Sequence, residues 1–182
     1  MTLFAGLEEI VETDVPLAPC TWFGIGGPAS YLVSPRTVAE LQEVARRCRD
    51  NEVPMFVLGG GANLLVDDAG VRGAVIHLRS GEFTDFARSE TGLRAASGAD
   101  LSKVVLRCVR GGLGGLEGVT GIPGTVGGGL RMNAGGAFGD IGSVVDSVEV
   151  MNEDGEIFTR YRDDLAFAYR SRSEERRVGK EC

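Results

Sequence analysis

The sequence has few of the residues on which hydrolytic active sites and metal centres are built. Its one histidine, His77, falls inside the apolar run AVIHL, which is typical of a strand. Zinc hydrolase sites and Ser-His-Asp triads need histidine as a ligand or a base, so the sequence disfavours both and indicates a structural role for His77. The cysteines form no CxxC pair, which favours buried, inert thiols over a metal site or a disulfide framework. They are Cys20, Cys48, Cys108 and Cys182.

The sequence also lacks a long apolar run and a cluster of basic residues. Its first residues carry no basic region of a signal peptide, and no segment approaches the ~18 consecutive apolar residues of a membrane-spanning helix. The formal net charge is −7, and lysine and arginine gather only in the last few residues, which argues against nucleic acid as a partner. We therefore expect a soluble, cytoplasmic protein with no membrane partner and no obligate protein partner.

Glycine is the residue that the sequence has in excess, and its placement is uneven. Half of the 28 glycines lie between Gly111 and Gly142. Such density costs backbone entropy on folding, so a folded protein keeps it where the chain needs positive φ or close approach to a ligand. A flexible linker is the alternative. Apolar residues interleaved with the glycines, such as Leu116, Val119 and Ile122, disfavour it.

The first half of the chain contains a predicted strand, helix and strand pattern. Thr37 and Glu40 form a capping-box pair at the start of a helix over 37–51. The strands MFVL and AVIHL follow, with the glycine turn GGGANLLV between them, which indicates an α+β or α/β unit. The apolar stripe of the helix consists of Val38, Leu41, Val44, Ala45 and Cys48.

The second half begins with another predicted helix, over 101–110, capped by Asp100 and ended by Gly111. Further along, SVEVMNEDGEIFTRY alternates on both sides of the turn residues NEDG, which predicts a β-hairpin. The apolar face of this helix is expected to contain Leu101, Val104, Val105, Cys108 and Val109.

Two glycine segments are the candidates for chemistry, at 59–66 (GGGANLLV) and 115–136 (GLEGVTGIPGTVGGGLRMNAGG). Consecutive glycines let several backbone N–H groups face one anion without obstruction, so each segment could hold part of a diphosphate. Neither signal is specific alone. The first segment departs from the dinucleotide fingerprint GxGxxG, because Leu64 stands at the third glycine.

Four sequence motifs follow one another along the chain. These motifs resemble those of the UDP-N-acetylmuramate dehydrogenases, the MurB family, over about 21–170. Four motifs in the right order are far more specific than any one of them. They read TWFGIGGPASYLV, VLGGGANLLV, GLEGVTGIPGTVGGGLRMNAGG and LAFAYR.

The resemblance implies an α+β fold, the FAD-binding fold of the vanillyl-alcohol-oxidase (PCMH) type, with two α/β subdomains at 1–80 and 81–171. FAD lies between the subdomains in that family. The residues expected to line its diphosphate are Gly59, Gly60, Gly61, Ala62, Asn63 and Leu64. Those expected near the flavin and its ribityl chain are Ile122, Pro123, Gly124, Gly127, Gly128, Asn133 and Gly135.

The resemblance also implies a reaction, the reduction of UDP-N-acetylenolpyruvoylglucosamine to UDP-N-acetylmuramate with NADPH as hydride donor and FAD as carrier. Arg170 matches the family arginine that contacts the substrate carboxylate, and a guanidinium suits that role because it binds a carboxylate bidentately and keeps its charge. The family's proton-donating serine and second acidic residue are expected in a C-terminal substrate domain that this sequence lacks. Residues 172–182 (RSEERRVGKEC) resemble a translated sequencing adapter and are expected to be non-native.

Two alternatives remain open. One is another flavin oxidoreductase of the same fold, although related oxidases often bind flavin covalently through histidine or cysteine, and no cysteine lies in a glycine loop here. The other is a non-catalytic FAD-binding module that acts only with a partner chain. Because the proton donor and the closing wall of the site are missing, the isolated chain is expected to bind FAD weakly at best and to show no measurable turnover.

Overall fold

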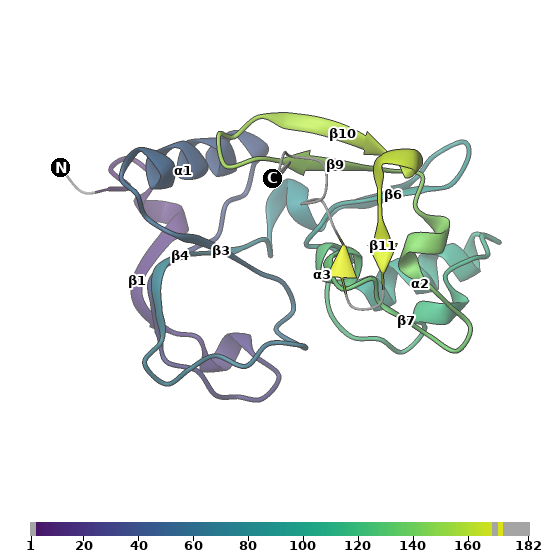
Figure 1. The fold of residues 1–182 in the computed structure, drawn as a ribbon, viewed down its shortest axis with the longest axis horizontal. Coiled ribbons are helices and arrows are strands. Elements are labelled where there is room, and N and C mark those ends of the chain that lie inside the picture. Colours follow the sequence, from purple (N-terminus) through teal and green to yellow (C-terminus); the bar gives the residue numbers. More distant parts are fainter. Residues whose placement is uncertain (1–2, 169–170, 173–182) are drawn as a thin grey trace, which may run out of the picture.

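In the computed structural model, residues 3–168 and 171–172 are described. They form an α+β fold with two lobes that lie side by side, the first ending near residue 78 (Figure 1). No helix among the described residues combines the length and the apolar composition needed to cross a membrane.

A four-stranded mixed sheet forms the first lobe. Its order is β1 (Val11–Pro16), β2 (Pro28–Val33), β4 (Val71–His77) and β3 (Met55–Leu58). The first pair, β1 and β2, is antiparallel, whereas β4 pairs in parallel with both β2 and β3. Helix α1 (Val38–Asp50) connects β2 to β3, and the short 3-10 helices Glu8–Ile10 and Ala18–Cys20 flank β1. The glycine turn after β3 therefore leaves from an edge strand of this sheet.

Strand side chains alternate between the two faces of the sheet, and both faces carry buried residues. On one face, Val33 and Ile76 pack with Val44 and Cys48 of α1. On the other face, Leu32, Leu58 and Val75 form a second cluster together with Leu17, Ala29 and Val66. Burying each large aliphatic side chain contributes roughly 1.5–3 kcal/mol relative to its exposure, so these two clusters hold the sheet and α1 together.

The second lobe packs around helix α2 (Leu101–Arg110) and the short helix α3 (Val126–Arg131). Its core contains Leu101, Val104, Val119, Val126 and Ile141. In the described part of the chain this lobe also contains four antiparallel strand pairs. They are β5 (Phe86–Arg88) with β6 (Leu93–Ala95), β7 (Gly135–Gly136) with β8 (Gly139–Asp140), β9 (Ser147–Met151) with β10 (Ile157–Tyr161), and β11 (Phe167–Ala168) with β12 (Ser171–Arg172). Short 3-10 helices lie at Gly81–Thr84, Glu117–Val119, Ile141–Val144 and Arg162–Asp164.

The predicted helices and hairpin are confirmed. Helix α1 has the complete capping box, with Thr37 accepting from the Glu40 N–H and the Glu40 side chain accepting from the Thr37 N–H. Helix α2 begins at the Asp100 cap and ends at Gly111. The hairpin β9–β10 has the predicted turn, with Gly155 at φ +81°.

The predicted apolar face of α2 is wrong at one residue, Val109. Val109 of α2 is 66% exposed, although Cys108 beside it is buried. Successive residues on a helix are about 100° apart, and the core of the lobe covers the face that carries Val104, Val105 and Cys108 without reaching Val109.

Candidate functional site

The two glycine segments meet in space, one at the end of β3 and the other at the start of α3. A Cβ atom on Gly60 would lie 2.9 Å from the Cα of Gly124, and one on Gly59 would lie 2.8 Å from Oγ1 of Thr125. The missing side chains therefore allow direct contact between a loop of the first lobe and a turn of the second. Gly60 and Gly124, which are 64 residues apart in the sequence, thus belong to one junction.

A third loop joins the junction through Gly61. Its φ is +65°, and a Cβ there would lie 2.1 Å from the carbonyl oxygen of Cys20. The carbonyl of Gly61 accepts a hydrogen bond from the backbone N–H of Trp22 at 3.1 Å. The motif TWFGIGG thus lies against the motif GGGANLLV. Gly61 meets both of the physical conditions that require glycine, positive φ and close backbone approach.

The amides of this junction are available to an anion. None of the backbone N–H groups of residues 59–64 donates a hydrogen bond to any described residue, and the same holds for the amides of Gly124 and Thr125. Gly60, Gly61 and Gly124 carry no side chain over those amides. Amides without a partner on two adjoining loops favour bound negative charge, even in a protein of net charge −7. The residues present therefore fit a diphosphate.

The glycines inside α3 are less available than the sequence indicates. The N–H of Gly127 donates to the Ser97 carbonyl at 2.7 Å, and the N–H of Gly128 donates to Oγ1 of Thr125 at 3.2 Å. Ile122 is half-buried against the core of the second lobe, and Pro123, which has no N–H, is exposed. Among the residues expected near the flavin between 122 and 128, Gly124 is the one whose backbone N–H exists and donates to no described residue.

Thr125 is a residue of the junction that sequence reasoning missed. Its hydroxyl caps α3 by accepting from the Gly128 N–H, and it lies within reach of Gly59. The signal was present in the sequence as a threonine before an apolar residue, a common helix start. The three glycines that follow concealed it, because glycine is a poor helix former.

Asn133 and Gly135 have structural partners. The Asn133 amide donates to Oδ2 of Asp140 at 3.1 Å and its carbonyl accepts from the Gly142 N–H at 3.1 Å, while its own φ is +43°. A Cβ on Gly135 would lie 2.5 Å from the Cβ of Asp140. These contacts hold the hairpin β7–β8. A place for either residue in a cofactor site stays a prediction.

The predicted substrate arginine, Arg170, lies outside the described residues. The strand before it passes the start of the 141–144 turn, where a Cβ on Gly142 would lie 2.5 Å from the ring of Phe167. Strand β12 contacts α3. The role of Arg170 therefore stays a prediction, although the chain on either side of it returns to the lobe that carries α3.

His77, Cys48 and Cys108 take no reactive form. His77 is half-buried at the end of β4, its Nδ1 has no hydrogen-bond partner among the described residues, and burial together with the charge of Arg79 lowers its pKa. Burial raises the pKa of the Cys48 thiol to about 11 and also raises that of Cys108. Both thiols are protonated at neutral pH, as the sequence predicts. Clusters of three or more metal-ligating side chains do not occur in the described part of the chain.

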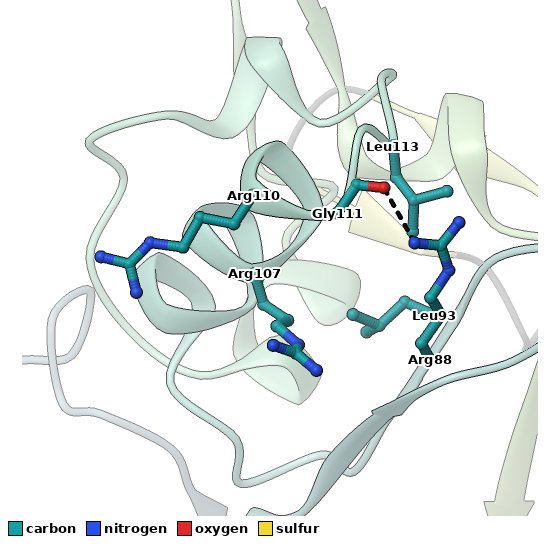
Figure 2. Close-up of a pocket in the computed structure, with 6 residues that line it drawn as sticks. All are labelled: Arg88, Leu93, Arg107, Arg110, Gly111 and Leu113. Atoms are coloured by element: carbon teal, nitrogen blue, oxygen red, sulfur yellow. Dashed lines mark hydrogen bonds between the residues drawn. The ribbon is translucent and has the colours of Figure 1, made fainter.

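A pocket of about 230 Å³ lies at the other end of α2. In Figure 2, Arg107 points towards Leu93 and Arg88, whereas Arg110 points away from them. Arg88 donates to the carbonyl of Gly111 at 2.9 Å. Cations at this end of a helix complement the helix dipole, so the arginines have a structural role. The lining residues are Arg88, Leu93, Arg107, Arg110, Gly111 and Leu113. The pocket is separated from the glycine junction by the length of α2, roughly 15 Å for ten residues.

Comparison with known proteins identifies this arrangement. Residues 29–160 match the model of a family described as FAD binding domain. The UDP-N-acetylenolpyruvoylglucosamine reductase of Clostridium botulinum (strain Alaska E43 / Type E3) is 42% identical over 171 residues, which cover 93% of this chain and 56% of that protein. The enzyme of the same name from Desulfosudis oleivorans is 42% identical over 167 residues, 90% of this chain and 53% of that protein.

Solved structures agree with the sequence comparison. A crystal structure of UDP-N-acetylenolpyruvylglucosamine reductase (MurB) from Thermus caldophilus is similar with a TM-score of 0.72 at 37% identity, covering 89% of this chain and 56% of that one. A solvent-stable cholesterol oxidase has a TM-score of 0.68 at 18% identity over 86% of this chain and 34% of its own, a likeness of fold alone. The predicted fold, the FAD-binding fold of the vanillyl-alcohol-oxidase (PCMH) type, is confirmed.

The chain spans about half the length of the curated relatives it matches. The junction of glycine loops, the family match and the similarity to the reductases fall on the same residues. The chain therefore belongs to the FAD binding domain family, in the form found in UDP-N-acetylenolpyruvoylglucosamine reductases.

Proposed function

We propose that this chain is the FAD-binding half of an enzyme that reduces UDP-N-acetylenolpyruvoylglucosamine to UDP-N-acetylmuramate. The observation that carries the proposal is the junction of Gly59–Gly61 with Gly124 and Thr125, whose free amides suit a diphosphate. Two reductases that are 42% identical over 171 and 167 aligned residues support this choice of substrate. The reaction belongs to peptidoglycan precursor synthesis, which takes place in the cytoplasm and supports cell shape and division.

The residues of the chain have three tasks in this proposal. Amides from residues 59–64 and 124–125 bind and orient the diphosphate, so that their dipoles offset the repulsion of an acidic protein. The boundary between lobes 1–80 and 81–171 holds the cofactor, with Ile122, Pro123 and Gly124 on the side of the second lobe. Bound FAD supplies hydride transfer, and NADPH is the expected donor.

Arg170 has the task of binding the carboxylate of the substrate. Hydride addition to the enolpyruvyl group builds negative charge beside that carboxylate, and a guanidinium placed there stabilises the charge because it remains protonated. The chain itself carries no residue that matches the family's proton donor. An open half-site would also admit water, which weakens the electrostatic stabilisation.

A kinetic assay tests the proposal. The chain alone, supplied with FAD, NADPH and UDP-N-acetylenolpyruvoylglucosamine, is expected to show no substrate-dependent oxidation of NADPH. A fusion of residues 1–171 to the remaining part of the Thermus caldophilus reductase is expected to show it, and Arg170→Ala in that fusion is expected to reduce the rate by about 100-fold, as for loss of a charge-stabilising donor. Turnover by the 182-residue chain alone would contradict the proposal.

One observation favours a second candidate, a non-catalytic FAD-binding module that acts with a partner chain. The loops at the junction expose Trp22, Phe23 and Leu65, and each of these side chains is at least 65% exposed. Apolar side chains beside a cofactor site are typical of a surface that another domain covers. Restoration of activity by a separately expressed C-terminal half would favour the module.

A further inference from the structure

The hairpin β9–β10 is attached to the rest of the molecule in an unusual way. None of its residues belongs to the hydrophobic clusters formed by the described residues, and every residue of β10 is exposed. A two-stranded hairpin alone is marginally stable in water. Val148, Val150 and Met151 of β9 are half-buried, and polar contacts at the two ends of the hairpin attach it to both lobes.

The tip of the hairpin is bound to α1 of the first lobe. Nε2 of Gln42 donates to the carbonyl oxygen of Gly155 at 2.7 Å, and Nη1 of Arg49 lies 2.7 Å from Oδ1 of Asp154. Gly155 is buried, and a Cβ there would lie 3.4 Å from the carbonyl oxygen of Gln42. The turn is pre-shaped for this contact, because the side chain of Asn152 accepts from the Asp154 N–H at 3.0 Å.

The base of the hairpin is bound to the second lobe. Glu149 pairs with Arg94 of β6. The guanidinium of Arg162 donates to the carbonyls of Ser143 at 2.9 Å and Val145 at 3.0 Å. The hairpin thus spans from the lobe that carries Gly124 to α1, the helix that packs on the sheet of the first lobe; Figure 1 shows β9, β10 and α1. Gly59 directly follows β3 of that sheet.

The position of these contacts matters for the glycine junction. The loops there touch through bare backbone, which gives little attraction to hold them in register. A shift of one lobe relative to the other would separate the amides of Gly60 and Gly124, and an anion bound between them would lose donors. A second attachment, far from the junction, resists such a shift.

We propose that β9–β10 is a clamp that sets the spacing of the two glycine loops, with Gln42, Arg49, Asp154 and Gly155 as positioning residues for the FAD site. The clamp rests on the proposed function, because it assigns these residues to the same cofactor. They do not touch the junction and act through the relative placement of the lobes.

Paired substitutions test the clamp. Gln42→Met with Arg49→Ala removes both contacts at the tip while keeping the length of the Gln42 side chain. The dissociation constant for FAD, measured by quenching of flavin fluorescence, is expected to rise about threefold to tenfold, the combined effect of one hydrogen bond and one exposed ion pair. The matched control is Arg46→Ala, because Arg46 pairs with Glu43 and Asp50 of α1 itself. It is expected to change the constant less than twofold.

A charge exchange separates positioning from general damage. Asp154→Lys alone is expected to weaken FAD binding, and Arg49→Glu added to it is expected to restore at least half of the loss on a logarithmic scale. The restored variant should also recover the visible spectrum of bound flavin. Equal weakening in the single and double variants would overturn the ion-pair part of the clamp.

A measurement without FAD keeps the clamp separate from the proposed function. Thr13→Cys and Ser102→Cys place one spin label on each lobe, at positions that are both exposed. Cys20 and Cys182 are replaced by serine so that they are not labelled, and the two labels then report the distance between the lobes. The Gln42→Met/Arg49→Ala variant is expected to broaden the distance distribution. If the unmodified chain fails to bind FAD, the proposed function fails, but the distance between the lobes still shows whether the clamp holds them in place. An unchanged distance distribution in the Gln42→Met/Arg49→Ala variant would overturn the clamp. A broadened distribution with unchanged FAD affinity would overturn it as well.

Discussion

At the scale of single residues, Gly60 and Gly124 bring two loops that are far apart in the sequence into direct contact. Consecutive glycines at 59–61 indicated a main-chain anion site, and their amides do remain unpaired among the described residues. The sequence could not show that Gly60 meets Gly124, because contact between residues 64 apart depends on how the lobes pack. It also could not show that the amides of Gly127 and Gly128 are already used.

Gly60→Ala tests the contact between the loops. The added methyl would lie 2.9 Å from the Cα of Gly124, so the loops must separate, and overpacking of this kind costs about 1–3 kcal/mol. FAD affinity is expected to fall about tenfold or more, as measured by fluorescence titration. Gly92→Ala is the control, because a Cβ there meets nothing within 4 Å. Equal effects of the two substitutions would mean that the loop contact does not govern binding.

His77 gives a prediction about pH. Burial and Arg79 lower its pKa below the ordinary value of 6.5, so the folded protein binds fewer protons than the unfolded chain just below that pH. The contribution of His77 to the free energy of unfolding is therefore fully present above pH 6.5. It declines as the pH falls through 6.5 towards the lowered pKa.

Urea melts at pH 7.5 and 5.5 measure this effect. The wild-type chain is expected to be less stable at pH 5.5, and His77→Phe, which removes the unpartnered Nδ1, is expected to lose part of that difference. Identical pH dependence in the two proteins would exclude His77 as the group that titrates.

At the scale of elements, the sequence predicted those with strong local signals. Helices α1 and α2 combine a capping side chain with an apolar stripe, and both were found at the predicted bounds to within a residue. Helix α3 was not predicted, since it contains three glycines, each costing roughly 1 kcal/mol relative to alanine. Tertiary packing supplies the reason for the glycines, because a Cβ on Gly129 would lie 3.3 Å from Leu101 and 3.5 Å from Ile141.

The capping box of α1 can be tested by Thr37→Ala. The substitution removes the hydroxyl that accepts from the Glu40 N–H at 3.2 Å. Loss of such a cap costs about 1 kcal/mol in the free energy of unfolding, measurable by urea denaturation. Thr91→Ala, at an exposed loop position, is expected to change the same quantity by less than about 0.5 kcal/mol. An equally small effect at Thr37 would contradict a stabilising role for the cap.

At the scale of the whole molecule, the lobes have separate hydrophobic clusters and meet through glycine loops and a hairpin. This arrangement could not be predicted from periodicity or capping, which report on single elements. The resemblance of four ordered motifs predicted the fold, and the comparisons confirmed it. The boundaries at 80 and 171, and the residues that bind FAD, stay predictions.

Trp22 offers a test at this scale. It is the one tryptophan of the chain, it is 67% exposed, and its backbone N–H is bonded to Gly61 in the glycine loop. In a chain completed by the C-terminal half of a relative, we expect a shift of its emission to shorter wavelength and weaker quenching by acrylamide, because the added half covers it. Unchanged emission would mean that this surface stays open in the complete enzyme.

The central claim is that backbone amides from two loops bind the diphosphate of FAD, and a titration tests it most directly. FAD is added to the 182-residue chain while flavin fluorescence and the emission of Trp22 are followed. We expect a saturable change in both signals below about 1 mM, equivalent to a binding free energy stronger than about −4 kcal/mol, with Gly60→Ala weaker than Gly92→Ala. No saturable change up to that concentration, or equal affinity in the two variants, would contradict the claim.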